Sequence, residues 1–227
     1  MIGLLQCDHV DDRFRSVSGD YDAMFREWLP GEWRVYDMAA LECPASIDEC
    51  DAYVTTGSRA SVYDDQPWIH AFADLVRRID SAKVPFLGMC FGHQMMAHAL
   101  GGRVARSSKG WAVGVHEFRV NIRESWMDPP LESFRVLMSC QDQVQALPPE
   151  SIVLASNTHC PVGLFRVRNM LGLQGHPEFS PAYAEALLKH RAAIIGSERV
   201  DAALATLARP VNRSELSSWA SRFLFDR

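Results

Sequence analysis

The amino-acid sequence predicts an α/β fold, with a mostly parallel central sheet, helices on both faces and an antiparallel extension. Up to Met89, short apolar runs alternate with longer helix-like stretches, which is the rhythm of a parallel sheet. Between Gly102 and Gly175, strand-like runs follow one another across short turns, which favours antiparallel pairing. After Pro181 the pattern is helical again.

The first part of the chain predicts the parallel half of the sheet. Short apolar runs bounded by polar or turn residues are typical of strands, and longer runs with helical spacing are typical of helices. The expected strands are Ile2–Cys7, Arg34–Asp37, Ala52–Thr55 and Val84–Met89. The expected helices between them are Tyr21–Leu29 and Pro67–Ser81.

The later part predicts the antiparallel extension and a helical end. The turns between these strands contain Pro, Gly or Asn. The expected strands are His116–Ile122, Phe134–Met138, Ile152–Ser156, Gly163–Val167 and Met170–Gln174, and the expected helices are Ala182–Ile195, Val200–Leu207 and Ser214–Phe225. We expect residues 1–227 to form one domain, with a helical C-terminal extension from about residue 181, because α/β domains of this length are ordinary.

The composition excludes several classes of function. The 23 basic and 28 acidic residues are scattered and give a net charge of −5, so we expect no nucleic-acid partner. No long apolar run predicts a membrane span, and the N-terminus lacks a signal-peptide pattern, so we expect a cytoplasmic protein. The six cysteines and eight histidines show no ligand spacing. We therefore expect no metal and no cofactor.

Cys90 is the candidate nucleophile. A buried-strand pattern at Val84–Leu87 leads directly into Gly88-Met89-Cys90-Phe91-Gly92, and Met95–Leu100 is helix-like. Glycines two residues on either side of a nucleophile allow a tight strand-to-helix turn that exposes it. The helix N-terminus favours the thiolate and can receive a developing oxyanion. An isolated cysteine is more often a packing residue, but this spacing favours a nucleophile.

His176 and Glu178 are the candidate base and its orienting acid. His176 follows the expected strand Met170–Gln174, and Pro177 stiffens the backbone before Glu178. In an extended backbone the two side chains point to the same side, so Glu178 can hold one imidazole nitrogen while the other faces Cys90. His159 is a lower-ranked alternative. His93 and His98, on the helix after Cys90, are expected to be packing or surface residues.

These residues resemble a known family. The segments Gly88–Gln94 and Gln174–Glu178, in this order, are similar to the two signatures of the class I glutamine amidotransferases. Thr56-Gly57-Ser58 is similar to the oxyanion loop of that family, and Ser139–Pro148 to the segment that holds the amino-acid end of the substrate. The resemblance spans roughly residues 2–185 and implies a flavodoxin-like sheet.

The resemblance also implies a role for each site residue. Cys90 would form a γ-glutamyl thioester that water hydrolyses, with His176 and Glu178 completing a catalytic triad. The backbone N–H groups of Gly57 and Phe91 would stabilise the oxyanion. Four further residues would bind a glutamine or γ-glutamyl substrate, the last two through their backbone: Ser58, Gln94, Gln141 and Asp142.

Several departures from the family pattern bear on the substrate. Gly175 and Thr56-Gly57-Ser58 resemble the free-standing, GMP-synthase-like branch, which includes γ-glutamyl peptidases, and Cys140 stands where relatives commonly carry histidine. One hypothesis is a glutaminase that supplies ammonia to a separate synthase subunit. Another is a self-sufficient hydrolase of γ-glutamyl peptides. A non-catalytic binding protein is the third hypothesis.

Overall fold

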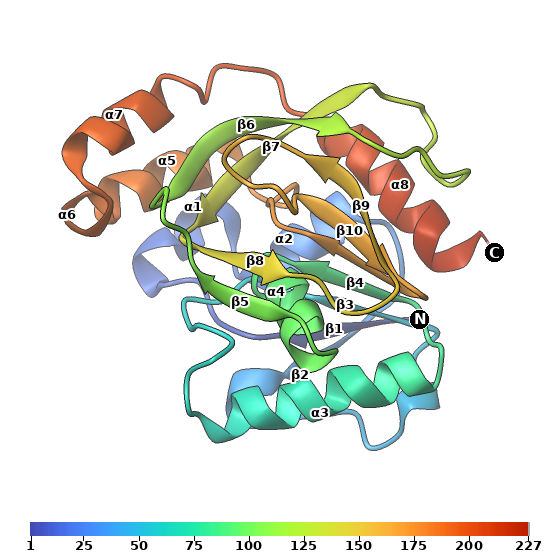
Figure 1. The fold of residues 1–227 in the computed structure, drawn as a ribbon. Coiled ribbons are helices and arrows are strands. Elements are labelled where there is room, and N and C mark those ends of the chain that lie inside the picture. Colours follow the sequence, from blue (N-terminus) through green and yellow to red (C-terminus); the bar gives the residue numbers. More distant parts are fainter. Residues whose placement is uncertain (227) are drawn as a thin grey trace.

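The central feature of the protein is a nine-stranded sheet in the order β2-β1-β3-β4-β11-β10-β9-β6-β7 (Figure 1), seen in a computed structural model that describes residues 1–226. The strands from β2 to β11 run parallel, and those from β11 to β7 alternate in direction. The predicted α/β class, the mostly parallel sheet and its antiparallel extension are confirmed.

The parallel half follows the expected runs with changes of one or two residues at the ends. Strand β4 begins at Phe86, because Pro85 has no N–H to donate to a neighbouring strand. The parallel strands are β1 (Ile2–Gln6), β2 (Trp33–Asp37), β3 (Ala52–Thr55), β4 (Phe86–Met89) and β11 (Met170–Leu173).

Strand β11 joins the two halves of the sheet. It was expected among the antiparallel strands, but it pairs parallel with β4 and antiparallel only with β10. The antiparallel strands are β10 (Leu164–Val167), β9 (Ser151–Ser156), β6 (Ala112–Val120) and β7 (Ser133–Cys140). Strand β6 starts four residues before the expected His116 and continues the hairpin with β7 down to Cys140.

A second, two-stranded sheet was not predicted from the sequence. Strands β5 (Arg103–Arg106) and β8 (Asp142–Ala146) pair antiparallel, apart from the main sheet. Each is short and carries charged or amide side chains, so neither shows the apolar alternation that predicts a strand. Short helical turns at Asp12–Phe14, Arg15–Ser18 (α1), Met38–Ala40 and Ile47–Glu49 were also not predicted.

The helices fall close to where the sequence predicts them, with three corrections. The expected helix Val200–Leu207 lies three residues earlier, at Ser197–Leu204. The helix after Cys90 begins at Phe91, four residues before the expected Met95. The expected helix Ala182–Ile195 is broken at Arg191. The helices are α2 (Tyr21–Trp28), α3 (Pro67–Ser81), α4 (Phe91–Ala99), α5 (Pro181–His190), α6 (Ala192–Ile195), α7 (Ser197–Leu204) and α8 (Arg213–Phe225).

Helices cover both faces of the parallel strands. Consecutive strand residues point to opposite faces, so Leu5 packs with residues of α3 and α4, whereas Leu4 packs with residues of α2 and α8. Figure 1 shows α3 on one side of the sheet and α8 on the other. Across residues 1–226, no helix has the length and apolar character needed to cross a bilayer.

Candidate active site

The candidate site lies at the carboxyl ends of neighbouring parallel strands. Gly57 follows β3, Cys90 follows β4 and His176 follows β11, and these three strands are adjacent in the sheet. Open α/β sheets commonly bind ligands at this edge. The topology therefore brings together three segments that are far apart in the sequence.

Cys90 occupies a strained turn between β4 and α4. Its φ of 45° and ψ of −92° are unusual for a residue with a side chain. A Cβ on Gly88 would lie 2.6 Å from the Gly92 backbone, and one on Gly92 would lie 1.5 Å from Thr55 Oγ1. Both flanking glycines are therefore required for the close packing of this turn, as the spacing predicts.

His176 and Glu178 are in direct contact. Nδ1 of His176 lies 2.8 Å from Oε1 of Glu178, and both residues are almost fully buried. The backbone between them is a turn, closed by a long Phe179 N–H to His176 carbonyl hydrogen bond of 3.4 Å, and not the extended segment assumed from the sequence. The Phe179 ring stacks on the imidazole with centroids 4.1 Å apart, which fixes the ring orientation.

Charges in the site favour a thiolate beside an imidazolium. A hydrogen bond from the Cys140 thiol lowers the pKa of Cys90 below its ordinary 9.0, burial opposes this, and the charge of His176 lowers it further. Burial alone would lower the pKa of His176, but the negative charges of Glu178 and Cys90 raise it above 6.5. Between pH 6.5 and 9.0, both groups are therefore charged.

The role of Cys140 in this charge balance can be tested by substitution. A donor to a thiolate favours the charged form, so Cys140→Ala is expected to raise the pKa of Cys90. The measurement is the pH dependence of alkylation of Cys90 by iodoacetamide, followed by mass spectrometry of its peptide. The alkylation midpoint should move to higher pH in Cys140→Ala and less in Cys140→Ser, which keeps a donor. An unchanged midpoint in Cys140→Ala would contradict this account.

Gly57 and Phe91 present backbone amides at the same place. Among the described residues, neither N–H donates to another group, and Phe91 is the first residue of α4. A Cβ on Gly57 would lie 2.9 Å from Cε1 of His176 and 3.7 Å from Cβ of Cys90. The absence of a side chain at Gly57 therefore leaves room for the imidazole. Two free amides here are suited to bind an oxyanion.

Gln174 is a site residue that the sequence analysis did not single out. Its Nε2 donates to Sγ of Cys90 at 3.5 Å, and its Oε1 accepts from Nε2 of Gln94 at 3.3 Å. Gln94 Nε2 also donates to the carbonyl of Asp142 at 2.8 Å. Gln174 directly follows β11 and lies two residues before His176. In an extended backbone, side chains at this spacing point to the same side, so the sequence could have indicated that Gln174 lies near Cys90.

A cleft of about 390 Å³ opens beside Cys90. It is lined by the four expected substrate-binding residues, Ser58, Gln94, Gln141 and Asp142. Asp142 accepts a hydrogen bond from the Ser61 hydroxyl at 2.6 Å, which orients its carboxylate. His176 and Glu178 are buried and do not line the cleft. The cleft volume falls within the range of small-molecule sites.

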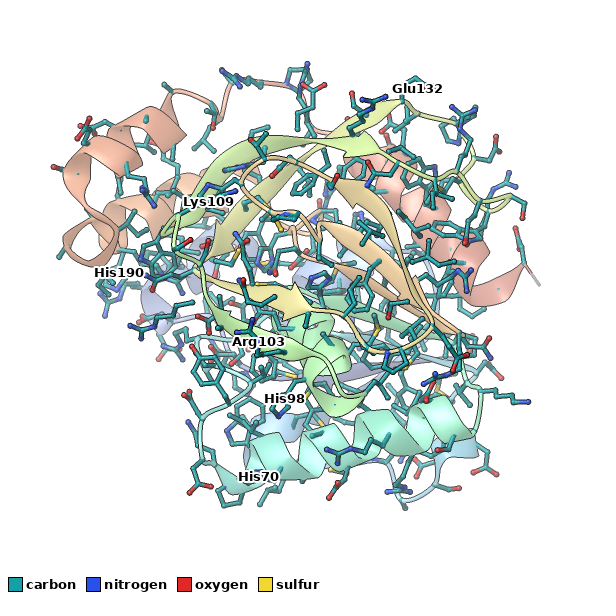
Figure 2. The ribbon with its side chains drawn as sticks, in the orientation of Figure 1. His70, His98, Arg103, Lys109, Glu132 and His190 are labelled. Atoms are coloured by element: carbon teal, nitrogen blue, oxygen red, sulfur yellow. The ribbon has the colours of Figure 1, made fainter. Side chains whose placement is uncertain are left out.

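The other histidines have different surroundings. His93 is fully buried on α4 and packs edge-on against Phe165, with centroids 4.9 Å apart, while His98 is exposed (Figure 2). The His159 ring packs against His116 with centroids 5.7 Å apart. In the described part of the chain, no group of three or more His, Cys, Asp or Glu residues is arranged to hold a metal ion.

Comparison with known proteins finds sequence relatives that include gamma-glutamyl peptidases and GMP synthases. The family model described as "Glutamine amidotransferase class-I" matches residues 43–193. Gamma-glutamyl peptidase 4 of Arabidopsis thaliana is 29% identical over 178 residues, which cover 73% of this chain and 70% of that protein. Gamma-glutamyl peptidase 3 of the same plant is 30% identical over 141 residues, which cover 59% of this chain and 57% of that protein. A GMP synthase of Thermomicrobium roseum is 34% identical over 131 residues, covering 55% of this chain and 23% of the synthase.

Solved structures with the same fold cover nearly the whole chain. A glutamine amidotransferase of Thermotoga maritima superposes with a TM-score of 0.77 at 20% identity, over 99% of this chain and 98% of that one. A second, from Methylobacillus flagellatus, gives a TM-score of 0.71 at 18% identity and covers 98% of this chain and 93% of that one. At these identities the likeness shows the fold.

Proposed function

The chain belongs to the class I glutamine amidotransferase family, and from this premise we propose that it hydrolyses a γ-glutamyl amide through a thioester on Cys90. The observation that carries the proposal is the contact of Cys90 with a paired His176 and Glu178 at the edge of an open cleft. Nucleophile, base and orienting acid are the groups that acyl transfer requires.

In the first half of the proposed reaction, the Cys90 thiolate attacks the amide carbonyl. The carbonyl oxygen becomes an oxyanion, which accepts hydrogen bonds from the N–H groups of Gly57 and Phe91. His176, already protonated, gives its proton to the leaving nitrogen. The carbon–nitrogen bond then breaks, and an amine or ammonia leaves behind a γ-glutamyl thioester.

In the second half, water hydrolyses the thioester. Neutral His176 takes a proton from the water as the water attacks the thioester carbonyl, and Glu178 stabilises the imidazolium that forms. The carbon–sulfur bond breaks, glutamate is released and the thiolate of Cys90 returns. Each group ends the cycle in its starting protonation state.

We favour γ-glutamyl peptides as substrates over glutamine alone. The cleft extends beyond Cys90 to Arg191 and Ile194, which leaves room for a leaving group larger than ammonia. The similarity to gamma-glutamyl peptidases also supports γ-glutamyl peptides as the substrates. A glutaminase that supplies a separate synthase is the second candidate, and the similarity to GMP synthase supports it.

The two candidates differ in what the purified chain does alone. We expect it to hydrolyse a γ-glutamyl dipeptide without any partner, with kcat/KM at least about tenfold higher than for glutamine, because only the dipeptide uses the outer part of the cleft. The measurement is glutamate release from the two substrates, with Cys90→Ala as the blank. Turnover of glutamine alone, or a rate that appears only with a synthase partner, would contradict this choice.

A further inference from the structure

Arg191 differs from its neighbour Arg59 in how its charge is compensated. Both line the cleft beside Cys90, and both also line an adjoining cavity of about 160 Å³. The guanidinium of Arg59 is paired with Asp8, with Nε and Nη2 at 2.9 and 2.8 Å from its carboxylate oxygens. Among residues 1–226, Arg191 has a hydroxyl partner, Ser139 Oγ at 3.2 Å, and no carboxylate.

The position of Arg191 makes an unpaired charge costly. Arg191 is half-buried at the break between α5 and α6, directly after His190, which Figure 2 labels. A cation that is partly removed from water gains stability from an anionic partner, and guanidinium groups match carboxylates in a two-point geometry. The position is therefore suited to an anion that arrives with the substrate.

Other charged side chains in the cleft are suited to bind the γ-glutamyl end of the substrate. The carboxylate of Asp142 is aligned by Ser61, and Arg106 lies directly opposite Asp142 in the β5–β8 pair. An ammonium and a carboxylate on one carbon fit such an opposite-charge pair. Arg191 comes from a different element and also lines the second cavity, so its charge is available to another part of the ligand.

We propose that Arg191 binds a carboxylate on the leaving-group side of the substrate, so that the preferred substrates are γ-glutamyl peptides with a free carboxylate beyond the scissile amide. This inference rests on the proposed function and adds which γ-glutamyl peptides the protein prefers. The second cavity gives the leaving group room past Arg191, where its walls include Phe14, Tyr21 and Tyr183. Arg191 is thus a specificity residue, distinct from the groups that perform the bond cleavage.

The test compares γ-glutamyl-alanine with γ-glutamyl-alaninamide, which differ only in the terminal carboxylate. For the unaltered protein, kcat/KM is expected to be about 10- to 100-fold higher for the acid, as for a hydrogen-bonded ion pair. Arg191→Gln should lower kcat/KM for the acid by about this factor, so that the ratio of acid to amide falls to about one. Arg191→Lys should retain part of the preference, because lysine keeps the positive charge but lacks the planar guanidinium that binds a carboxylate at two points.

Arg103→Gln is the matched control. Arg103 (Figure 2) is an exposed arginine on β5 that does not line the cleft, so this substitution removes the same charge without touching the ligand. It should keep the full preference for the acid. Equal kcat/KM for acid and amide, or a preference that survives Arg191→Gln, would overturn the role of Arg191. Failure of the unaltered protein to cleave either compound would instead overturn the proposed function.

Discussion

Replacement of Cys90 by alanine is expected to reduce turnover of γ-glutamyl amides by at least about a thousandfold, because Cys90 supplies the thiolate, whereas the neighbouring Cys90 and burial raise the pKa of the Cys140 thiol. The fold should persist, since the turn geometry depends on Gly88 and Gly92 more than on the thiol. The measurement is glutamate release under saturating substrate, with circular dichroism and thermal melting to verify folding.

The matched control for this substitution is another cysteine. Cys43 is exposed and does not line the cleft, so Cys43→Ala should retain full activity. Cys7 and Cys50 are buried and do not line the cleft, and their alanine variants should keep the chemistry if they fold. Near-normal turnover by folded Cys90→Ala would remove Cys90 from the mechanism.

His176→Ala and Glu178→Gln are expected to differ in severity. His176 protonates the leaving nitrogen and later activates water, so its loss should lower kcat by about 100- to 10,000-fold. Glu178 orients the imidazole at 2.8 Å and stabilises its charge, and water and Phe179 stacking can replace part of that support. We therefore expect Glu178→Gln to retain a measurable rate, well above that of His176→Ala.

Single-turnover kinetics on a γ-glutamyl amide measure this difference at the chemical step, with folding verified by thermal melting. Glu178→Gln as inactive as Cys90→Ala would mean that the acid does more than orient the base. His176→Ala near the rate of the unaltered protein would mean that another group transfers the proton. Each result would change the assignment of roles within the triad.

The pH profile follows from the same charges. The pKa of Cys90 is lowered, so its thiolate is lost only as pH falls below that value, and the raised pKa of His176 keeps the imidazolium until pH rises past it. Activity should therefore form a plateau that includes pH 6.5 to 9.0.

The sequence allowed prediction of those parts of the site that are local in the chain. The turn at Cys90 depends on two glycines within five residues, and the strand and helix around it are adjacent in sequence. The spacing of His176 and Glu178 predicts that the two side chains meet, and they are in contact, although the backbone between them is a turn and not an extended segment. Local patterns constrain local geometry, even where the assumed backbone is wrong.

Contacts between distant segments could not be predicted in the same way. The hydrogen bond from Gln174 to Cys90 depends on the pairing of β11 with β4, which brings residues 84 positions apart into contact. The position of Arg191 in the cleft depends on a helix break that its own sequence does not mark. Strands β5 and β8 lack the apolar alternation that predicts a strand, and their pairing in a small separate sheet joins segments far apart in the sequence.

During turnover, Cys90 is expected to carry the γ-glutamyl group as a thioester. The most direct test mixes the protein with excess γ-glutamyl amide, quenches it in acid within the first turnover and determines the mass of the Cys90 peptide. An adduct of one γ-glutamyl group is expected on Cys90, and it should be removed by hydroxylamine and be absent from Cys90→Ala. A protein that releases glutamate without any adduct on this peptide, or with the adduct on another cysteine, would contradict the account.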